Sequence, residues 1–555
     1  MDQSRYALFV SALAGFTALS TLPCSAATCS DSKTKAPPRY TLTVDVTKSL
    51  HITSPKFLSL TLAGGHIRHK LEGFDYRSKK LQNLAKALSP AIVRIGGTYT
   101  DYIYFIENPS SSQGRSQIKV RKIDKTDSIR LVIQDKNTHR REGNKQEDAG
   151  RERTQQVYQR VRYGRINYAM TGEQWDNITR FYKTVGWDMM WDFNILVKKN
   201  GSWDPWNAKK FLEYSASRNV KIPMFQLGNE PNLGKPPIKA EQLAKDHRTL
   251  KTLLSGIPQY AASAVFGPSV TNLDRNPKPR NYLIRFLEAC GCETITELCL
   301  HHYYLKRFSP LRDFMDVKIM EGLRIHLQQA SHILWSTCGG RKRVSLTETS
   351  TATGGGVPRI SNAFVAGFLW LDKLGLSAIY GVTHVFRQTF YSAPYALVTD
   401  TKLIPNPDYY LSVIYKRLVE GHVFRVNIEF LSPMIRIYAH CARNSFYNYP
   451  DGAIVVYYLN IAATPSNLSL GQFEIPACGN QSQVDLFIFT ASTGDMKDRV
   501  AKLNGKELKM NGPNLPDMDP QRHTGDVSLP AKSYGFIVIP EAGVALCRCY
   551  HRFAN

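Results

Sequence analysis

The stretch IPMFQLGNEPNLG, residues 222–234, joins an apolar run to an abrupt polar turn. Residues 222–227 have the length and composition of a buried β-strand, and Asn229, Glu230 and Pro231 follow almost at once. In a barrel of parallel strands, functional side chains stand where the strands end, at the C-terminal face. The stretch therefore predicts a buried strand that carries Glu230 to such a face.

Seven further apolar runs, each bounded by turn residues, accompany this strand along the chain. They lie at 57–62, 91–95, 188–196, 262–266, 298–303, 344–347 and 381–386. Helical patterns separate them, for example at 78–89, 206–218, 280–290 and 361–375. Eight strands that alternate with helices predict an α/β fold, a (β/α)8 TIM barrel.

After a last helical pattern at 408–419, short alternating strands take over, at 434–440, 453–461, 484–489 and 533–539. This rhythm is typical of a β-sandwich. The early strand 39–47 has no helix behind it and is expected to join that sheet. We predict a strand segment of the sandwich at 36–52, a barrel at 53–107 and 160–417, and a C-terminal β-sandwich domain at 418–555.

Residues 108–159, between the second and third strands, fit neither domain. The segment is polar, rich in Lys, Arg, Asp and Glu, and has little aliphatic periodicity. A connection of this length without regular structure is either functional or disordered. A solvated insertion without consequence is the alternative.

The chain begins with a signal-peptide pattern at 1–27: one Arg, an apolar run at 6–22 and small residues at 25–27. An uncleaved membrane anchor is the alternative, and no later segment is long and apolar enough to span a bilayer. Four Asn-X-Ser/Thr sites fit a secretory route, at Asn177, Asn200, Asn467 and Asn480. We therefore expect a secreted glycoprotein.

The balance of 71 Lys+Arg against 46 Asp+Glu, formally +25, favours a polyanionic partner. Nucleic acid, an anionic membrane surface and a sulfated polysaccharide all have the required charge. Secretion argues against nucleic acid, which leaves the other two.

The cysteines give a partial constraint. Nine of the ten cysteines remain if Cys24 is removed with the signal peptide. At least one of the nine is therefore unpaired or pairs between chains. The spacing of Cys290, Cys292, Cys299 and Cys338 lacks the paired CxxC arrangement of a zinc site. We therefore expect no metal there.

A second glutamate, Glu348, follows the run 344–347 as Glu230 follows the run 222–227. Two carboxylates that face each other across a barrel mouth suit glycoside hydrolysis, in which one protonates the leaving oxygen and the other attacks the anomeric carbon or activates water. The alternative for either residue alone is a helix cap or a surface ion pair. No convincing phosphate-binding loop, dinucleotide fingerprint or zincin motif is present, so we expect no cofactor.

The residues beside Glu230 strengthen this interpretation. The amide of Asn229 can hydrogen-bond a sugar hydroxyl next to the scissile bond. Pro231 is expected to restrict the backbone of Glu230 and so to help fix its carboxylate.

Several motifs together resemble the heparanases, retaining endo-β-glucuronidases that cut heparan sulfate. They are VRIGGTYTD, QLGNEPN, LHHYYL, LTETSTATGGG, AGFLWLDKLGLSA, FRQTF and NPDYYLSVIYKRLV. The resemblance runs from about residue 58 to residue 547 and excludes most of 108–159. It implies that Glu230 is the general acid/base and Glu348 the nucleophile.

The resemblance also implies sugar contacts. Tyr303 would donate a hydrogen bond to Glu348, and the backbone of Gly354 and Gly355 would bind the carboxylate of a uronic acid. Further contacts to that sugar are implied for Asn229, Thr98, Gln388 and Tyr395. His301 and His302 are expected to be structural or sugar-contacting, because the paired acids already supply the proton chemistry.

A basic rim is expected on the loops after the fifth and sixth strands, at Arg275, Lys278, Arg280, Lys306 and Arg307. These cations would grip sulfated sugars on either side of the cleaved bond. A solvated basic face is the alternative.

Members of this family in animals are latent single chains that a protease activates by excising a linker. The resemblance therefore implies that 108–159 is an excisable basic linker, and that the processed protein is a heterodimer of a small and a large fragment. It also implies a disulfide between Cys441 and Cys547. The expected partners are heparan sulfate, heparin and heparan sulfate proteoglycans, at the cell surface, in the extracellular matrix or in the lysosome.

This chain departs from the family pattern at three positions. Ala63 and Gly65 stand where the family's first strand ends in an acidic residue and an amide, and Thr353 replaces an aromatic hydroxyl. Two other functions therefore stay open: a related glycosidase acting on hyaluronan or terminal glucuronides, and a catalytically silent heparan-sulfate-binding protein.

Overall fold

The computed structural model describes residues 36–69, 71, 73–108, 118–122, 128–133, 156–160, 168–234, 236–274, 276–429, 431–470 and 483–548. The predicted signal peptide at 1–27 lies outside the described residues, as do Arg275 and Asn480. Within the described ranges, no helix has the length and apolarity needed to cross a membrane.

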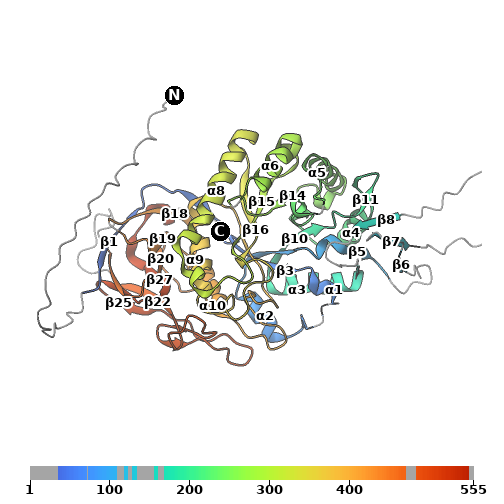
Figure 1. Cartoon of the computed structure of the whole chain (residues 1–555). Coiled ribbons are helices and arrows are strands. Elements are labelled where there is room, and N and C mark those ends of the chain that lie inside the picture. The colour runs from blue at the N-terminus through green and yellow to red at the C-terminus, as the bar shows by residue number, and fades with distance from the viewer. Residues whose placement is uncertain are drawn as a thin grey trace, which may run out of the picture. The chain divides into compact units, whose positions relative to one another are not determined.

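Eight parallel strands close into a barrel in the central part of the chain (Figure 1). They are β3 (Leu58–Ala63), β4 (Ala91–Gly96), β10 (Trp187–Phe193), β13 (Met224–Leu227), β14 (Ala264–Val270), β15 (Glu297–Leu305), β16 (Arg343–Ala352) and β17 (Val385–Arg387). Each overlaps one of the predicted apolar runs. The predicted TIM barrel is therefore confirmed.

Helices alternate with these strands. They are α2 (Lys79–Lys86), α3 (Gly172–Val185), α4 (Trp206–Ser217), α5 (Ala240–Ser255), α6 (Pro277–Phe286), α8 (Val317–Cys338), α9 (Ala366–Ile379) and α10 (Pro407–Leu418). Two of them, α9 and α10, are buried on nearly all sides. Local sequence fixes their ends: α3 starts with a capping box between Thr171 and Gln174 and stops at Gly186, whose φ is 74°.

The barrel interior is built in layers. An apolar plug consists of Ile92, Met190, Phe266, Cys299 and Phe386. Side chains two positions further along a strand point to the same side. The next inward layer, on the side of the C-terminal strand ends, is therefore polar, with Arg94, Asp192, Gln226 and His301 following Ile92, Met190, Met224 and Cys299. The plug closes the barrel beneath these polar side chains.

A 12-stranded sheet follows the barrel along the chain. Its central strands are β18 (Val419–Asn427), β19 (Ile435–Ala442), β20 (Ile454–Asn460), β22 (Val484–Ala491) and β27 (Ser533–Ile539). The early strand β1 (Arg39–Asp45) pairs with β18 and with β21 (Ser466–Leu470), and Figure 1 shows it in blue beside these orange and red strands. Residues close in space here are thus about 400 positions apart in sequence.

The two faces of this sheet bury different partners. Alternate residues such as Ile437, Val456 and Ile537 pack on Leu42 and Leu468 in a core of their own. Their neighbours Tyr438, Tyr457 and Phe536 belong instead to the main core, which contains the barrel helices. The sandwich is therefore joined to the barrel by a continuous apolar contact.

Two disulfides are present in the described part of the chain. Cys441 and Cys547 are paired with a Cα–Cα distance of 5.4 Å, the pairing that the resemblance implied. Cys292 and Cys338 also form a disulfide, which the sequence did not predict. The bridge joins the segment after α6 to the last turn of α8.

The segment after the second barrel strand has some regular structure. β6 (Ile118–Lys122), β7 (Ser128–Ile133) and β8 (Gln156–Arg160) pair as an antiparallel sheet, so the expectation of a connection without regular structure was wrong. The reason is local: IKVRK, SIRLVI and QVYQR each contain β-branched or aromatic residues that favour strands, a signal that the high charge of the segment obscures. At the base of the segment, β5 (Ile103–Ile106) pairs in parallel with β9 (Tyr168–Thr171).

Candidate active site

Glu348 lies within a strand rather than at its end. The sequence predicted a strand at 344–347, but β16 continues to Ala352. An irregularity in the pairing of β15 with β16, after Leu300, sets His301 opposite Glu348. Counted over the whole residue, Glu348 is 7% exposed, so its carboxylate is positioned by the barrel itself.

Arg94 connects the inward polar side chains. Its guanidinium is fully buried and donates to Glu348 Oε2 at 2.9 Å, to Asp192 Oδ2 at 2.9 Å and to Asn229 Oδ1 at 3.0 Å. Its Nε donates to Gln226. Side chains from β10, β13 and β16, and one from just beyond β13, thus meet at one buried cation, which fixes the geometry of the site.

Tyr303 completes the surroundings of Glu348. Its hydroxyl donates to Glu348 Oε1 at 2.7 Å, as expected from the sequence motif, although Tyr303 lies inside β15 rather than at its end. Burial raises the pKa of the Tyr303 phenol well above its usual value, so the phenol keeps its proton and remains a donor.

The pKa of Glu348 is lowered below the ordinary glutamate value. Burial alone raises the pKa of this carboxyl, but nearby His301 and Arg94 and the hydrogen bonds from Tyr303 and Arg94 outweigh it. Glu348 is therefore held in its ionised form.

Glu230 has different surroundings. It follows β13 with φ 47° and ψ 55°, a left-handed backbone rather than the extended one expected before Pro231. The chain turns here directly from the strand into the 3-10 turn Pro231–Leu233, and Gly228 is also left-handed. The side chain of Glu230 is 21% exposed, against 10% for Glu348.

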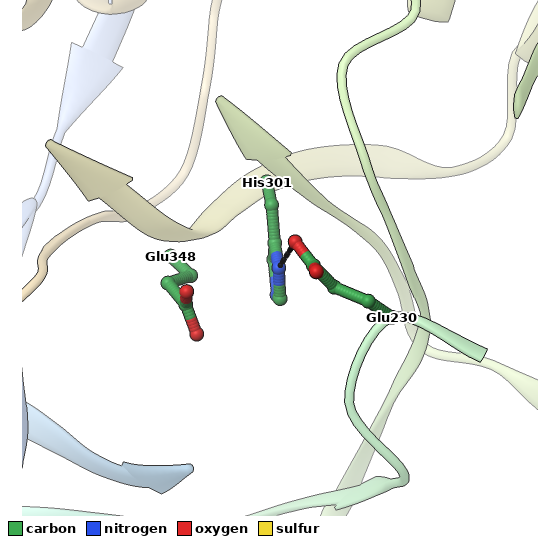
Figure 2. A group of neighbouring side chains, drawn as sticks. All are labelled: Glu230, His301 and Glu348. Carbon is green, nitrogen blue, oxygen red and sulfur yellow. Dashed lines mark hydrogen bonds and ion pairs between the residues drawn. The ribbon is translucent and has the colours of Figure 1, made fainter. Parts of the chain in front are cut away.

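His301 lies between the two glutamates (Figure 2). Its Nδ1 is 3.1 Å from Glu230 Oε1. A carboxylate oxygen of Glu230, one of Glu348 and an imidazole nitrogen of His301 all lie within 4.8 Å of one another. Among the described residues, this group brings three potential metal-ligand atoms near one another.

Asp192 shares the Arg94 guanidinium with Glu348. Burial raises the pKa of Asp192 to about 6 although Arg94 lowers it. Arg94, Asp192 and Gln226 were not predicted as site residues. The available signal was a charge inside an apolar run, as in AIVRIGG and WDMMWDF, because a buried ion needs a partner.

The expected uronate contacts gather beyond the ends of the strands. Gly354 and Gly355 follow β16 with φ values of 68° and 93°, a backbone that glycine adopts readily. Gln388 follows β17 and accepts a hydrogen bond from Thr61, while the ring of Tyr395 stacks near that of Tyr303, 6.4 Å between centroids. Thr98 is half-buried in the loop after β4.

The described residues of the basic rim differ in exposure and in hydrogen bonding. Lys306 and Arg307 are exposed on the loop after β15, and Lys278 is exposed in the first turn of α6, which follows the loop after β14. Arg280 is half-buried and donates to Leu273 O at 2.9 Å, so it braces the loop after β14.

The remaining expected residues lie elsewhere. His302 points to the opposite side of β15 from His301, and the buried Lys373 donates to its carbonyl at 3.0 Å. Of the described glycosylation candidates, Asn200 is exposed, whereas Asn177 and Asn467 are half-buried.

The comparisons with known proteins identify the family. The chain is 31% identical over 537 residues to the heparanase of Gallus gallus, covering 92% of this chain and 97% of that protein. The chain belongs to the heparanase family. Residues 131–375 also match the model of the glycosyl hydrolase family 79 N-terminal domain.

Two further similar proteins have names that describe a different activity or none. The chain is 28% identical to the inactive heparanase-2 of Mus musculus over 91% of its own length and 89% of that protein. It is 26% identical to the hyaluronoglucuronidase of Hirudo nipponia, covering 85% of this chain and 92% of that protein. Membership alone therefore does not decide activity or substrate.

The barrel and sheet also resemble solved glycoside hydrolases. The GH51 α-L-arabinofuranosidase of Thermotoga petrophila aligns with a TM-score of 0.61 over 90% of this chain and 100% of that chain, at 13% identity. This likeness concerns the fold.

Proposed function

We propose that the protein is a secreted, retaining endo-β-glucuronidase that cleaves heparan sulfate chains of proteoglycans. In this proposal Glu348 is the nucleophile and Glu230 the general acid/base. The proposal needs no cofactor, because the two carboxylates and their neighbours supply the groups that the reaction requires.

The short separation of the carboxylates is the observation that carries the proposal. Retaining enzymes hold their two carboxyl groups about 5 to 5.5 Å apart, whereas inverting enzymes leave about 6.5 to 9.5 Å for a water molecule. Oxygens of Glu230 and Glu348 within 4.8 Å of each other fit the retaining arrangement.

The surroundings of the two carboxylates support the division of roles. Glu348 is buried, ionised and held by Arg94 and Tyr303, as a nucleophile that attacks an anomeric carbon must be. Glu230 is more exposed and contacts His301, so its proton can pass to the leaving oxygen and later be recovered from the attacking water.

The chain's own residues also support a sulfated glucuronide substrate. The backbone of Gly354 and Gly355 would bind the uronate carboxylate beside Glu348, with Asn229, Thr98, Gln388 and Tyr395 around the same sugar. Lys278, Lys306 and Arg307 would contact sulfates on the flanking sugars, and Arg275 stays a candidate for the same role.

Hyaluronan is the second candidate substrate, and a specific observation favours it. Ala63 and Gly65 at the end of the first barrel strand remove two expected polar contacts on one side of the cleft. The similarity to the leech hyaluronoglucuronidase covers most of the chain. The altered contacts on that side leave a glycan other than heparan sulfate open.

Digestion of heparan sulfate, hyaluronan and chondroitin sulfate side by side, before and after proteolytic processing of the chain, tests the proposal. We expect the shortest products from heparan sulfate, and none from the Glu348→Gln variant. Preferential cleavage of hyaluronan would select the second candidate. Binding of heparin with no cleavage of any of the three would identify a silent binding protein.

We further propose that 108–159 is an excisable linker that keeps the uncut chain latent. The segment leaves the barrel after β4, on the face that carries Glu230, so it can cover the cleft. After excision the fragments would stay associated, because β5 and β9 pair across the cut and the barrel needs β3 and β4 to close.

A short Gly/Ser bridge in place of the segment tests the latency. The bridged protein is expected to cleave heparan sulfate without added protease. If it folds but is no more active than the uncut parent, the segment does not control access to the site.

A further inference from the structure

The group formed by Glu230, His301 and Glu348 offers one nitrogen and two oxygen donors on one side of the barrel mouth (Figure 2). These atoms lie within 4.8 Å of one another. Zinc bonds of about 2.0 to 2.2 Å to nitrogen and oxygen place neighbouring ligand atoms of a tetrahedral site about 3.4 Å apart. The ligand atoms would therefore have to approach one another only modestly.

The ligand atoms have lone pairs to spare. His301 is fully buried and its Nδ1 faces Glu230, so Nδ1 has its lone pair free when the ring proton is on Nε2, which makes no hydrogen bond within the described part of the chain. Each carboxylate oxygen has two lone pairs. Tyr303 and Arg94 each engage one oxygen of Glu348, which leaves a further lone pair on each.

The two glutamate side chains differ in how firmly they are held. Glu348 is fixed by two hydrogen bonds, whereas the side chain of Glu230 is partly exposed and its backbone starts a turn. A small rotation of the Glu230 side chain would close the distance to a shared ion, with water in the fourth position.

The charge of the site favours a dication. Glu230, Glu348 and Asp192 bring three carboxylates, and Arg94 is the cation bonded to two of them. With His301 neutral, as a metal ligand must be, and the three carboxylates ionised, the cluster has an excess of negative charge. The imidazole selects a borderline metal such as Zn²⁺ over Ca²⁺ or Mg²⁺, which prefer oxygen ligands throughout.

We propose that Glu230, His301 and Glu348 bind one Zn²⁺ ion and that this ion reversibly inhibits the enzyme. Zinc would withdraw the attacking carboxylate and the proton-transferring carboxylate at once, so bound zinc and turnover exclude each other. The inhibition rests on the proposed catalytic roles, whereas the binding of zinc does not.

Direct binding measurements on the full secreted chain test the site. Zn²⁺ affinity is measured by competition with a chromophoric chelator, and Co²⁺ is used to report the coordination through its visible absorption. His301→Gln is expected to lower the affinity of this site about tenfold or more and to abolish the Co²⁺ band. His332→Gln, an exposed histidine on α8, and Cys290→Ser, a free half-buried thiol, serve as matched controls and are expected to change neither.

Equal zinc affinity in the wild type and His301→Gln would overturn the site. Activity measurements then separate the binding of zinc from its inhibitory role. Inhibition of the proteolytically processed wild type by Zn²⁺ that a chelator reverses, at the concentration that fills the His301-dependent site, is the expected result. Zinc binding at His301 without inhibition would contradict the inhibitory role and the catalytic roles together, while leaving the metal site in place.

Discussion

Glu348 and Glu230 are the same residue type on opposite sides of His301, yet the fold treats them differently. Glu348 lies inside a central strand, 7% exposed, with Arg94 and Tyr303 on its two oxygens. Glu230 lies on a left-handed turn beyond a strand, with His301 at 3.1 Å. Position alone thus gives one chemical group two different environments, a difference that the proposed roles of nucleophile and general acid/base require.

The largest expected effect is the loss of the fixed anion. Glu348→Gln should lower kcat by roughly 10⁴-fold or more on every substrate, because it deletes the proposed nucleophile. Glu230→Gln should be comparably slow on heparan sulfate but partly spared on glucuronides with activated leaving groups, which need no proton. Initial rates on both substrate types measure this, with heparin binding as the control for folding.

Equal rescue of both variants by an activated leaving group would remove the distinction between the two residues. Full activity in either variant would exclude that residue from catalysis.

Arg94 is the side chain that makes the surroundings of Glu348 special. Arg94→Gln leaves Asp192 and Glu348 buried without their cation, which should lower the free energy of unfolding by about 3 to 5 kcal/mol. Since Arg94 lowers the pKa of Glu348, its removal should raise that pKa and move the acidic limb of the kcat/KM profile to higher pH.

Thermal unfolding and a pH–rate profile measure both effects, with the exposed Arg425→Gln as control. An unchanged acidic limb in a stable Arg94→Gln protein would show that Arg94 only supports the fold.

Tyr303→Phe should have a smaller effect in the same direction. It removes the 2.7 Å hydrogen bond to Glu348 and little volume. Hydrogen bonds to charged groups contribute about 1.5 to 3 kcal/mol, so we expect kcat/KM to fall about 10- to 100-fold. The acidic limb should again move to higher pH, by less than in Arg94→Gln. A rate loss without any movement of the limb would mean that Tyr303 acts on the sugar rather than on Glu348.

The sequence located most of this fold because apolar runs mark buried strands directly. It placed Glu348 at a strand end because the polar residues TETST resemble a loop. In the structure Thr347, Thr349 and Thr351 are buried inside β16, so the strand is longer than its apolar part. Buried hydroxyl groups hide a strand from a hydrophobicity pattern.

The hydrogen-bond network of Arg94 could not be predicted from the sequence, for a different reason. Its partners come from Asp192, Gln226, Asn229 and Glu348, which are up to 254 residues away in sequence. The pattern could show that Arg94 needed a counter-charge, but it could not show which one. Only the closed barrel brings these side chains together.

The smallest expected effect lies outside the carboxylate pair. Replacing Lys278, Lys306 and Arg307 together by Ala should raise KM for heparan sulfate about three- to tenfold, leave kcat unchanged and flatten the salt dependence of kcat/KM, because the lost contacts are screened surface charges. Neutralising Lys497, Lys506 and Arg522, exposed on the C-terminal sheet, is the matched control. The same salt profile in both triple variants would show that the rim does not bind substrate.

The covalent role of Glu348 is the central claim, and trapping its intermediate tests it most directly. A 2-deoxy-2-fluoro-glucuronide with an activated leaving group should form a stable glycosyl-enzyme, detectable as one added sugar in the intact mass. Peptide mapping should place that sugar on Glu348, and Glu348→Gln should not be labelled. A sugar attached to Glu230, or turnover that inverts the anomeric configuration without any labelled protein, would contradict the account.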